Sequence, residues 1–454
     1  MSTIPGILRP NQVIGKQKDK DLCLFIPDNE IEPFYVPYKN KQTRNFCKLY
    51  KDRFITVFKG DRIYIDQNIG EVTDFHAFCE YKIHCKKLNK KLFKFDKRNT
   101  AINPINNRII TIDSSTTRDY DDAVGINNNI LSVYIADVPS LLEQYQLWDK
   151  INKVSSIYLP DNVKRPMLPT TLSEDLLSLK ENTVKQTFCM NINMETFEIT
   201  FEQKVIKVEK NCVYETEELL NHDVYKQCYD AVQKLIEHYP YKQSVNNSYE
   251  LIEYLMLFMN AQSAITLKAH NVGVYRSVKI QNRIEGNTEL SKFLSYWRNA
   301  SSSYTLEPEE HMLLQIPDYV HITSPIRRLV DILNMYEMEK IIGIEFTDMA
   351  TEFVHRWYSN IDIINETVNN IRHVQNECAI LHYYWEREGD EDVDAYIIED
   401  NHPDYIIYIP SSKYVDKVHS DNMLNLHSKI KVKIYFFNDK VTLKKKIRMS
   451  ILDI

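Results

Sequence analysis

The sequence predicts an α+β fold in several domains, with a central domain of mixed sheet and helices flanked by two OB-type β-barrel domains. Three observations lead to this prediction. Short apolar segments separated by turn signals fill both ends of the chain. An amphipathic helical pattern occupies residues 248–276 in the middle, and 454 residues are enough for two or three cores. The predicted domains are 1–97, 98–376 and 377–454.

The composition restricts where a ligand could bind. The net charge of −7 would repel nucleic acid overall, so a nucleic-acid site would have to be a local patch or a lined channel. The eight cysteines form no CxxC pair and no secretion signal is visible, so we expect reduced thiols and a cytoplasmic location. No apolar run approaches the roughly 18 residues of a membrane span.

The first predicted domain contains short apolar segments at residues 22–26, 33–37, 54–58 and 62–65, which suits a five-stranded OB-type barrel. It ends in a basic stretch from Tyr81 to Arg98, in which eight Lys or Arg residues alternate with aromatic and aliphatic ones. This stretch has two interpretations that the sequence does not separate. It could be a groove for single-stranded nucleic acid, or a solvated edge strand protected by lysines.

Four acids gather near the start of the central domain. A β-branched run, residues 109–112, predicts a buried strand that ends in the first acid. Carboxylates this dense repel one another unless a cation lies among them, and oxygen ligands without Cys or His suit Mg²⁺, with Mn²⁺ as the alternative. An acidic surface turn is the other interpretation. The acids are Asp113, Asp119, Asp121 and Asp122.

An EF-hand is excluded as the explanation of these acids. A calcium loop that starts at Asp119 would place Ala123 at its fifth position, Val124 where the turn needs Gly, and Ile130 where the loop needs Glu.

The segment TID, five residues, then DYDDA resembles the catalytic loop of the ribonuclease II (RNB) exoribonucleases, with all four acids in register. Further segments resemble the same family in the same order. They are LSVYIADV, with Tyr134 for a usual His; SSIYLPDNVKRPMLPTTLSEDLLSL; and YVHITSPIRRLVDILNMYEM, with Leu329 for Tyr and Met335 for His. The central domain is therefore identified as an RNB catalytic domain.

The resemblance implies a role for individual residues. The four acids hold Mg²⁺, and Asp121, Asp122 and Arg327 take part in catalysis. Tyr158 packs on a base near the 3′ end of the RNA, and Glu253 and Asn260 face the substrate. Without the family, Tyr158 would be interpreted as a core or loop aromatic and Glu253 as a solvated helix acid.

The second arginine of the SPIRR segment, Arg328, is expected to contact the RNA backbone or to pair with Asp331. Ser324 and the proline after it suggest a helix start, since Ser can cap a helix and Pro fits its first turn. Both arginines would then oppose the helix dipole, which is unfavourable unless an anion is present. An ordinary solvated arginine pair is the alternative.

The last domain is expected to be a second OB-type barrel. An acidic turn at residues 386–394 leads into segments at 395–398, 405–409, 429–437 and 440–452. The final segment carries a basic stripe, which consists of Lys444, Lys445, Lys446 and Arg448.

The resemblance implies a Mg²⁺-dependent hydrolytic exoribonuclease that degrades single-stranded RNA from the 3′ end to nucleoside 5′-monophosphates. We expect a monomer without a membrane anchor, although a partner complex would be compatible with the sequence. The first alternative is an RNA-binding or regulatory protein that keeps the RNB fold without turnover. The second is a metal-dependent nuclease or phosphoesterase that acts on DNA.

Overall fold

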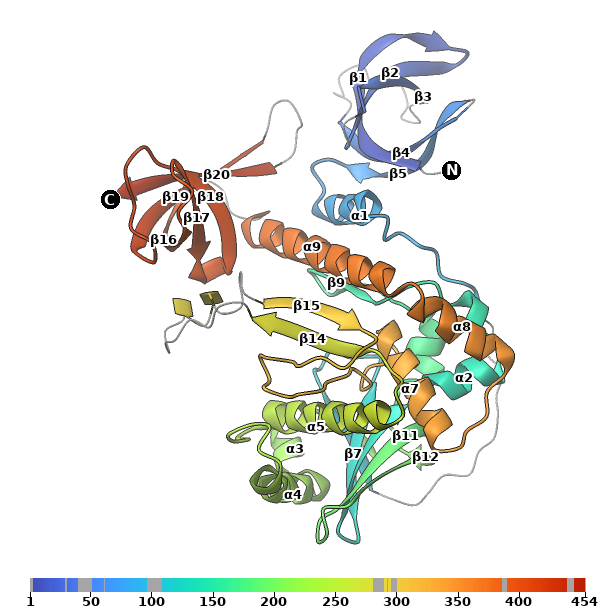
Figure 1. Cartoon of the computed structure of the whole chain (residues 1–454). Coiled ribbons are helices and arrows are strands. Elements are labelled where there is room, and N and C mark those ends of the chain that lie inside the picture. Colours follow the sequence, from blue (N-terminus) through green and yellow to red (C-terminus); the bar gives the residue numbers. More distant parts are fainter. Residues whose placement is uncertain are drawn as a thin grey trace.

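The computed structural model of the chain describes residues 3–28, 31–39, 51–60, 62–95, 108–280, 290–291, 293–294, 300–385, 390–438 and 445–453. These residues form a five-stranded sheet near each end of the chain and a six-stranded sheet between them, with helices on both faces of the central sheet (Figure 1). The predicted α+β multidomain fold with flanking β domains is therefore confirmed.

The N-terminal sheet has the strand order β3-β2-β1-β4-β5, and β3 also contacts β5, so the sheet closes into a small barrel. The sequence pattern does not predict β1, because two prolines and two glycines give this segment a low strand propensity. The strands are β1 (Thr3–Gln17), β2 (Lys20–Pro27), β3 (Phe34–Tyr38), β4 (Arg53–Lys59) and β5 (Ile63–Glu71).

The basic stretch that follows is helical where it begins. Tyr81 lies in helix α1 (Phe75–Cys85), is 1% exposed, and stacks on Phe54 with ring centroids 4.2 Å apart. Phe93 and Phe95 pack partly buried against the central core. Both interpretations of the stretch are wrong for these rings, because they stabilise the protein interior. The last three residues of the stretch lie outside the described residues.

The central sheet has the order β12-β11-β8-β7-β6-β13, in which β6 and β13 are parallel and the other neighbours antiparallel. Its strands are β6 (Ile109–Asp113), β7 (Asp122–Asn127), β8 (Ile130–Ala136), β11 (Val184–Asn193), β12 (Ile199–Lys207) and β13 (Lys210–Val213). Two further two-stranded sheets are formed by β9 (Ile157–Leu159) with β10 (Val163–Arg165), and by β14 (Tyr275–Ile280) with β15 (Ala300–Thr305).

Helices cover both faces of this sheet because its strands are apolar on both sides. Alternate residues of β6 show the division: Ile109 packs with α2, α7 and α8, and Ile110 packs with α4 and α5. None of the helices among the described residues is long and apolar enough to cross a membrane. The helices are α2 (Val138–Gln144), α3 (Glu217–Asn221), α4 (Asp223–His238), α5 (Ser248–Ala269), α7 (Leu329–Ile341), α8 (Asp348–Tyr358) and α9 (Ile361–Trp385).

Helix α5 ends earlier than the helical pattern predicts. The chain leaves the helix after Ala269, and Asn271 and Gly273 have φ values of +54° and +109°. This left-handed turn lets the following residues enter β14, so the prediction of a helix up to residue 276 is wrong at its end. The family departures Tyr134, Leu329 and Met335 are at most 1% exposed, and they fill the two cores beside the sheet.

The C-terminal sheet repeats the strand order of the first barrel, β18-β17-β16-β19-β20, with β18 in contact with β20. Helix α9 connects it to the central domain, and α1 packs against the same helix (Figure 1). The predicted boundary between residues 376 and 377 lies inside α9, because the apolar stripe of this helix continues through Cys378 and Leu381. The strands are β16 (Asp390–Glu399), β17 (Asp404–Ile409), β18 (Tyr414–His419), β19 (Lys429–Asn438) and β20 (Lys445–Asp453).

The acidic residues before this barrel form a strand where a turn is predicted. From Asp390 they belong to β16, and they face lysines of β19 across the sheet. Asp394 pairs with Lys429 at 2.8 Å and Asp390 with Lys433 at 3.4 Å, and opposite charges on facing strands stabilise a sheet. The predicted basic stripe at residues 444–446 lies outside the side chains that the structure describes.

A buried carboxyl pair joins α2 to α7. Asp137 caps α2 by accepting a hydrogen bond from Ser140 N at 2.9 Å, and its other oxygen accepts from Gln203 Nε2 at 2.9 Å. Glu339 is fully buried, and its carboxyl group faces that of Asp137. Burial and the neighbouring Asp137 carboxylate raise the pKa of Glu339 well above its usual range. Glu339 is therefore the member of the pair whose ionisation is more costly.

We expect Glu339→Gln to stabilise the protein at pH 8 by about 1 kcal/mol, because a neutral amide replaces an acid that is costly to ionise. A carboxyl whose pKa is raised on folding stabilises below its unfolded pKa, and this contribution is lost as the pH rises through the folded pKa. The gain in melting temperature should therefore disappear near pH 4. Asp137→Ala removes the helix cap and should destabilise the protein at both pH values. An equal effect of Glu339→Gln at pH 4 and pH 8 would contradict this assignment.

Candidate active site

Four acids line one cavity of about 330 Å³ at the end of β6. Strand β6 pairs with β7 through Ile109 and Ile110, and the loop between the two strands leaves the sheet beside the cavity. The first acid ends β6, the last begins β7, and the other two lie in the loop. The cavity therefore contains Asp113, Asp119, Asp121 and Asp122 together, and the interpretation of these residues as a solvated surface turn is wrong.

A buried serine holds the acid loop in place. Ser178 Oγ accepts a hydrogen bond from Tyr120 N at 3.0 Å and donates one to Arg118 O at 2.9 Å. The next residue, Leu179, donates its N–H to Tyr120 O at 3.0 Å. Ser178 is fully buried and belongs to the LSEDLLSL segment. This segment therefore holds the acid loop in place.

We expect Ser178→Ala to destabilise the protein by about 1–2 kcal/mol, since it leaves the partly buried Tyr120 amide without an acceptor. Thermal unfolding of the variant beside the native chain measures this loss. A variant with native stability would show that the loop is held by its backbone contacts alone.

The SPIRR segment, some 200 residues further on, closes the cavity. Asp121 is 4% exposed; its Oδ1 accepts a hydrogen bond from Ile326 N at 3.0 Å, and its Oδ2 lies 3.0 Å from Arg327 Nε. Arg327 also donates to Ser324 Oγ at 2.9 Å. The structure thus joins the two segments on which the family resemblance depends most strongly.

The predicted helix start at Ser324 is wrong. The residues from Ser324 to Arg327 form a turn, and α7 begins at Leu329. Arg328 has extended backbone angles, φ −136° and ψ 129°, and forms a bridge with Ser155. The reason is Asp331, which accepts hydrogen bonds from Ser324 N at 2.7 Å and from Arg328 at 2.8 Å. Both arginines therefore lie outside the first turn of the helix.

Burial and mutual repulsion make the cluster costly to ionise. Burial raises the pKa of Asp121 to about 7, even though Arg327 acts in the opposite direction. Burial raises the pKa of Asp113 as well, and the charges of Asp122 and Asp121 add to this effect. Asp113 Oδ2 is buried without a hydrogen-bond partner among the described residues. A bound cation would relieve all of these costs.

The acids have the ligand chemistry of a metal site, but their side chains are not arranged as one. All the acidic ligands are oxygens, which suits Mg²⁺ or Mn²⁺. However, no group of three or more His, Cys, Asp or Glu side chains in the described part of the chain is placed so that it could hold a metal ion. Two cationic side chains lie among the acids instead, since Lys164 pairs with Asp119 and Arg327 with Asp121. A metal at Asp119 would have to compete with Lys164.

Two of the four residues predicted to bind RNA lie at cavities. Tyr158 is 42% exposed, lines the acid cavity, and has Lys164 Nζ 5.6 Å from its ring centroid. It is therefore not a core aromatic. Arg328 pairs with Asp331 at 2.8 Å, as one of its two predicted roles requires, and lines a second cavity next to the first.

The other two residues are not brought to the acid cavity. Glu253 is exposed on α5 and pairs with Lys242, as the interpretation of a solvated helix acid predicts. Asn260 is 3% exposed; it accepts a hydrogen bond from Ile322 N at 2.9 Å and donates to Tyr319 at 2.9 Å. These two bonds fix the chain before the SPIRR segment, and Asn260 lines neither the acid cavity nor the second one, so a direct substrate contact is not supported.

Sequence reasoning misses two residues beside the acids and one further away. Lys164 lies at a variable position of a segment that resembles the family, and Ser178 is one of the residues that carry the resemblance, but the sequence predicts no role for either. Arg372 lies on α9 and lines the second cavity. No sequence signal indicates this position, because it depends on how α9 packs across the central domain.

The central part of the chain matches the model of the RNB domain over residues 104–238 and 216–343, which together are more than half of the chain. Ribonuclease R of Chlamydia pneumoniae is 40% identical over 102 residues, which are 20% of this chain and 15% of the relative. Ribonuclease R of Helicobacter pylori strain J99 is 29% identical over 228 residues, 45% of this chain and 34% of the relative. The matched segments thus span only a minor part of these curated relatives.

Solved structures resemble the whole fold. Apo RNase R of Mycoplasma genitalium has a TM-score of 0.75 at 15% identity and covers 99% of this chain and 90% of its own. The same enzyme in complex with ribose methylated single-stranded RNA gives 0.74. Yeast Ssd1, described as a pseudonuclease, gives 0.60 at 14% identity and covers 96% of this chain and 68% of its own. With the RNB match over more than half of its residues, the chain belongs to the RNB domain family.

Proposed function

We propose that the protein is a hydrolytic exoribonuclease that degrades single-stranded RNA from the 3′ end and releases nucleoside 5′-monophosphates. One observation supports this proposal most strongly: the contact of Asp121 with Ile326 N and Arg327. It places a guanidinium, which can bind a phosphate through a fork of donors, directly beside four carboxylates. Single-stranded RNA as substrate agrees with the ligand of the Mycoplasma genitalium RNase R complex.

The proposed cofactor is Mg²⁺, with Mn²⁺ as the alternative, held by Asp113, Asp119, Asp121 and Asp122. When bound, the ion would supply Lewis-acid chemistry: it would activate a water and offset charge on the leaving 3′ oxygen. The carboxylate oxygens and the unsatisfied Asp113 Oδ2 support this assignment.

The side chains of the chain would divide the remaining work. Arg327 would offset the negative charge that builds up on the scissile phosphate. Tyr158 presents an exposed ring at the cavity, and a ring of this kind can stack on any base. Asp122, at the start of β7, would affect turnover more than RNA binding.

A second candidate function is an RNA-binding protein that keeps the fold without turnover. Two observations favour it: the likeness to the pseudonuclease Ssd1 and the absence of an assembled metal-ligand group among the described residues. Against it, a site without turnover has no physical reason to keep four mutually repelling acids in one cavity. The exoribonuclease is therefore the proposal that the site supports best.

The decisive experiment is a time course on a 5′-labelled single-stranded RNA with Mg²⁺. Stepwise shortening from the 3′ end that stops in EDTA, with no cleavage of the matching DNA, is the expected result. RNA that is bound but remains intact in both Mg²⁺ and Mn²⁺ would favour the RNA-binding candidate. Equal cleavage of RNA and DNA would favour a metal-dependent nuclease without selectivity for ribose.

A further inference from the structure

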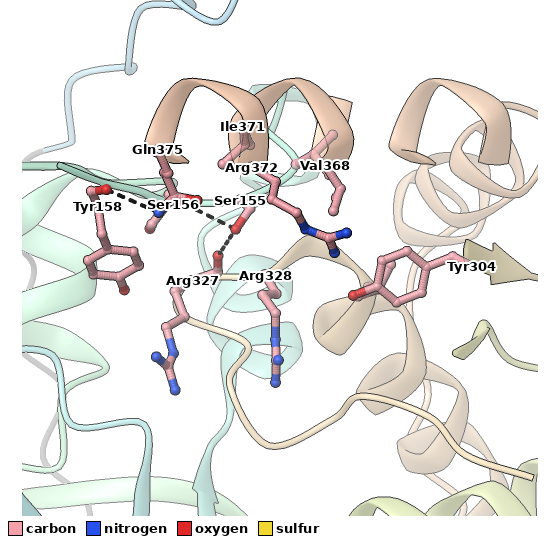
Figure 2. Close-up of a pocket in the computed structure, with 12 residues that line it drawn as sticks. Ser155, Ser156, Tyr158, Tyr304, Arg327, Arg328, Val368, Ile371, Arg372 and Gln375 are labelled. Atoms are coloured by element: carbon pink, nitrogen blue, oxygen red, sulfur yellow. Dashed lines mark hydrogen bonds between the residues drawn. The ribbon is translucent and has the colours of Figure 1, made fainter. Parts of the chain in front are cut away.

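A second cavity of about 280 Å³ lies next to the acid cavity and shares Tyr158 and Arg327 with it. Its lining includes three arginines, Arg327, Arg328 and Arg372, and none of its lining residues is acidic. Figure 2 shows Arg327 and Arg328 leaving the chain side by side, while Arg372 extends from α9 toward Tyr304. A cationic cavity in a protein with a net charge of −7 requires an explanation.

The positive charge around Tyr304 exceeds the negative charge. Arg276 lies against the Tyr304 ring with its guanidinium 4.8 Å from the ring centroid, and Arg328 and Arg372 line the cavity. Among the described residues, the ion pairs of these three arginines include one carboxylate, that of Asp331. Three cations beside a single anion favour binding of an anionic ligand.

The two arginines that line only this cavity keep free donors. Arg328 Nε is buried and has no hydrogen-bond partner in the described part of the chain. Arg372 is exposed, and its two terminal nitrogens each lie 3.4 Å from Ser302 Oγ, which is a long hydrogen bond. No ion pair joins Arg372 to a carboxylate of the described residues.

Helix α9 is fixed so that Arg372 stays at the cavity. Asn365, two turns earlier on the same face, accepts a hydrogen bond from Tyr304 N at 2.7 Å and donates to Tyr304 O at 2.9 Å. Gln375 donates to Tyr158 O at 3.1 Å. These bonds attach α9 to β15 and β9 on the two sides of Arg372, so the guanidinium is presented by a rigid element.

We propose that this cavity is a second phosphate subsite, in which Arg328 and Arg372 hold an internucleotide phosphate of the RNA strand on the 5′ side of the scissile phosphate. The inference rests on the proposed function and adds to it a contact that would position the strand. Because Tyr158 and Arg327 line both cavities, the two cavities lie next to each other, and a single strand with regularly spaced phosphates could place one phosphate in each. A released nucleoside 5′-monophosphate is the other source of the same phosphate chemistry.

The test is equilibrium binding of a ten-nucleotide single-stranded RNA to the full chain in EDTA, where no cleavage occurs. Arg372→Ala should weaken binding about tenfold, the loss of one charge-assisted contact, and reduce the slope of log K against log salt by about 0.7. Arg372→Lys keeps the charge but not the fork, so it should recover part of the affinity. Arg356→Ala, an exposed arginine of α8 outside both cavities, is the matched control and should bind as the native chain does.

The outcomes separate the subsite from the proposed activity. If the native chain cleaves RNA but Arg372→Ala binds like Arg356→Ala, the subsite is wrong and the activity stands. If cleavage fails but binding depends on Arg372, the activity is wrong and the subsite stands. If Arg372→Ala weakens binding of a nucleoside 5′-monophosphate but not of the RNA, the cavity holds product and the proposal is overturned. Melting temperatures of all variants confirm that they are folded.

Discussion

Asp122→Asn is expected to lower the rate of RNA cleavage by about 10³-fold or more, while binding of single-stranded RNA stays unchanged. Asparagine has nearly the shape of aspartate, so the start of β7 and its pairing with β8 should remain intact. The substitution removes one of the four carboxylates proposed to hold the metal. Cleavage rates under single-turnover conditions and affinity in EDTA measure the two effects separately.

The same variant should be more stable than the native chain at pH 8 without metal. Burial raises the pKa values of both Asp113 and Asp122, and the Asp122 charge contributes to the rise at Asp113. Such groups stabilise at low pH and lose this contribution as the pH rises through their folded pKa values. Removing the Asp122 charge should therefore raise the melting temperature in EDTA at pH 8 and change it little near pH 4.

A control variant separates this effect from a general loss of charge. Asp149→Asn changes an exposed acid that pairs with its neighbour Lys150, and it should alter neither cleavage nor the melting temperature. Loss of RNA binding in a folded Asp122→Asn protein would count against a role confined to turnover. Native cleavage by the variant would exclude Asp122 from the reaction altogether.

The parts of the fold that follow local rules could be predicted from the sequence. The run of β-branched residues before Asp113 forms β6, and the helical pattern that starts at residue 248 forms α5. β1 could not be predicted, because its prolines and glycines oppose strand formation and pairing on both sides with β2 and β4 stabilises it. The end of α9 could not be predicted either, because the apolar stripe of this helix continues across the predicted domain boundary.

The sequence motifs predict the four acids, Arg327 and Tyr158 at the acid cavity, but not the residues that packing between distant elements brings to the cavities. The four acids are close in sequence, and the family resemblance groups Arg327 with them. All five residues line the same cavity. Tertiary packing decides the rest. Asn260 is used to bond Ile322 N and Tyr319, although its motif indicates a substrate contact. Arg372 reaches the second cavity only because α9 is bonded to Tyr304.

Arg327→Ala is expected to lower kcat by about 10²- to 10³-fold, the usual loss when one donor to a developing negative charge is removed. Its effect on KM should be smaller, because Arg328 and Arg372 remain to bind the strand. Arg327→Lys keeps the positive charge but loses the bidentate fork, so it should recover only part of kcat. Arg118→Ala, an exposed arginine of the acid loop that does not line the cavity, is the matched control.

This substitution also has a pH-dependent cost that a purely catalytic residue would not show. Arg327 is the ion-pair partner of the buried Asp121 and opposes the rise of its pKa, so its removal raises that pKa beyond about 7. The variant should then lose about 1–2 kcal/mol of stability above pH 7, a value reduced for the partial exposure of Arg327. At pH 5 Asp121 is protonated and the loss should shrink. A loss of stability that is equal at pH 5 and pH 8 would mean that Arg327 stabilises the protein through packing. The charge of Arg327 would then not affect the ionisation of Asp121.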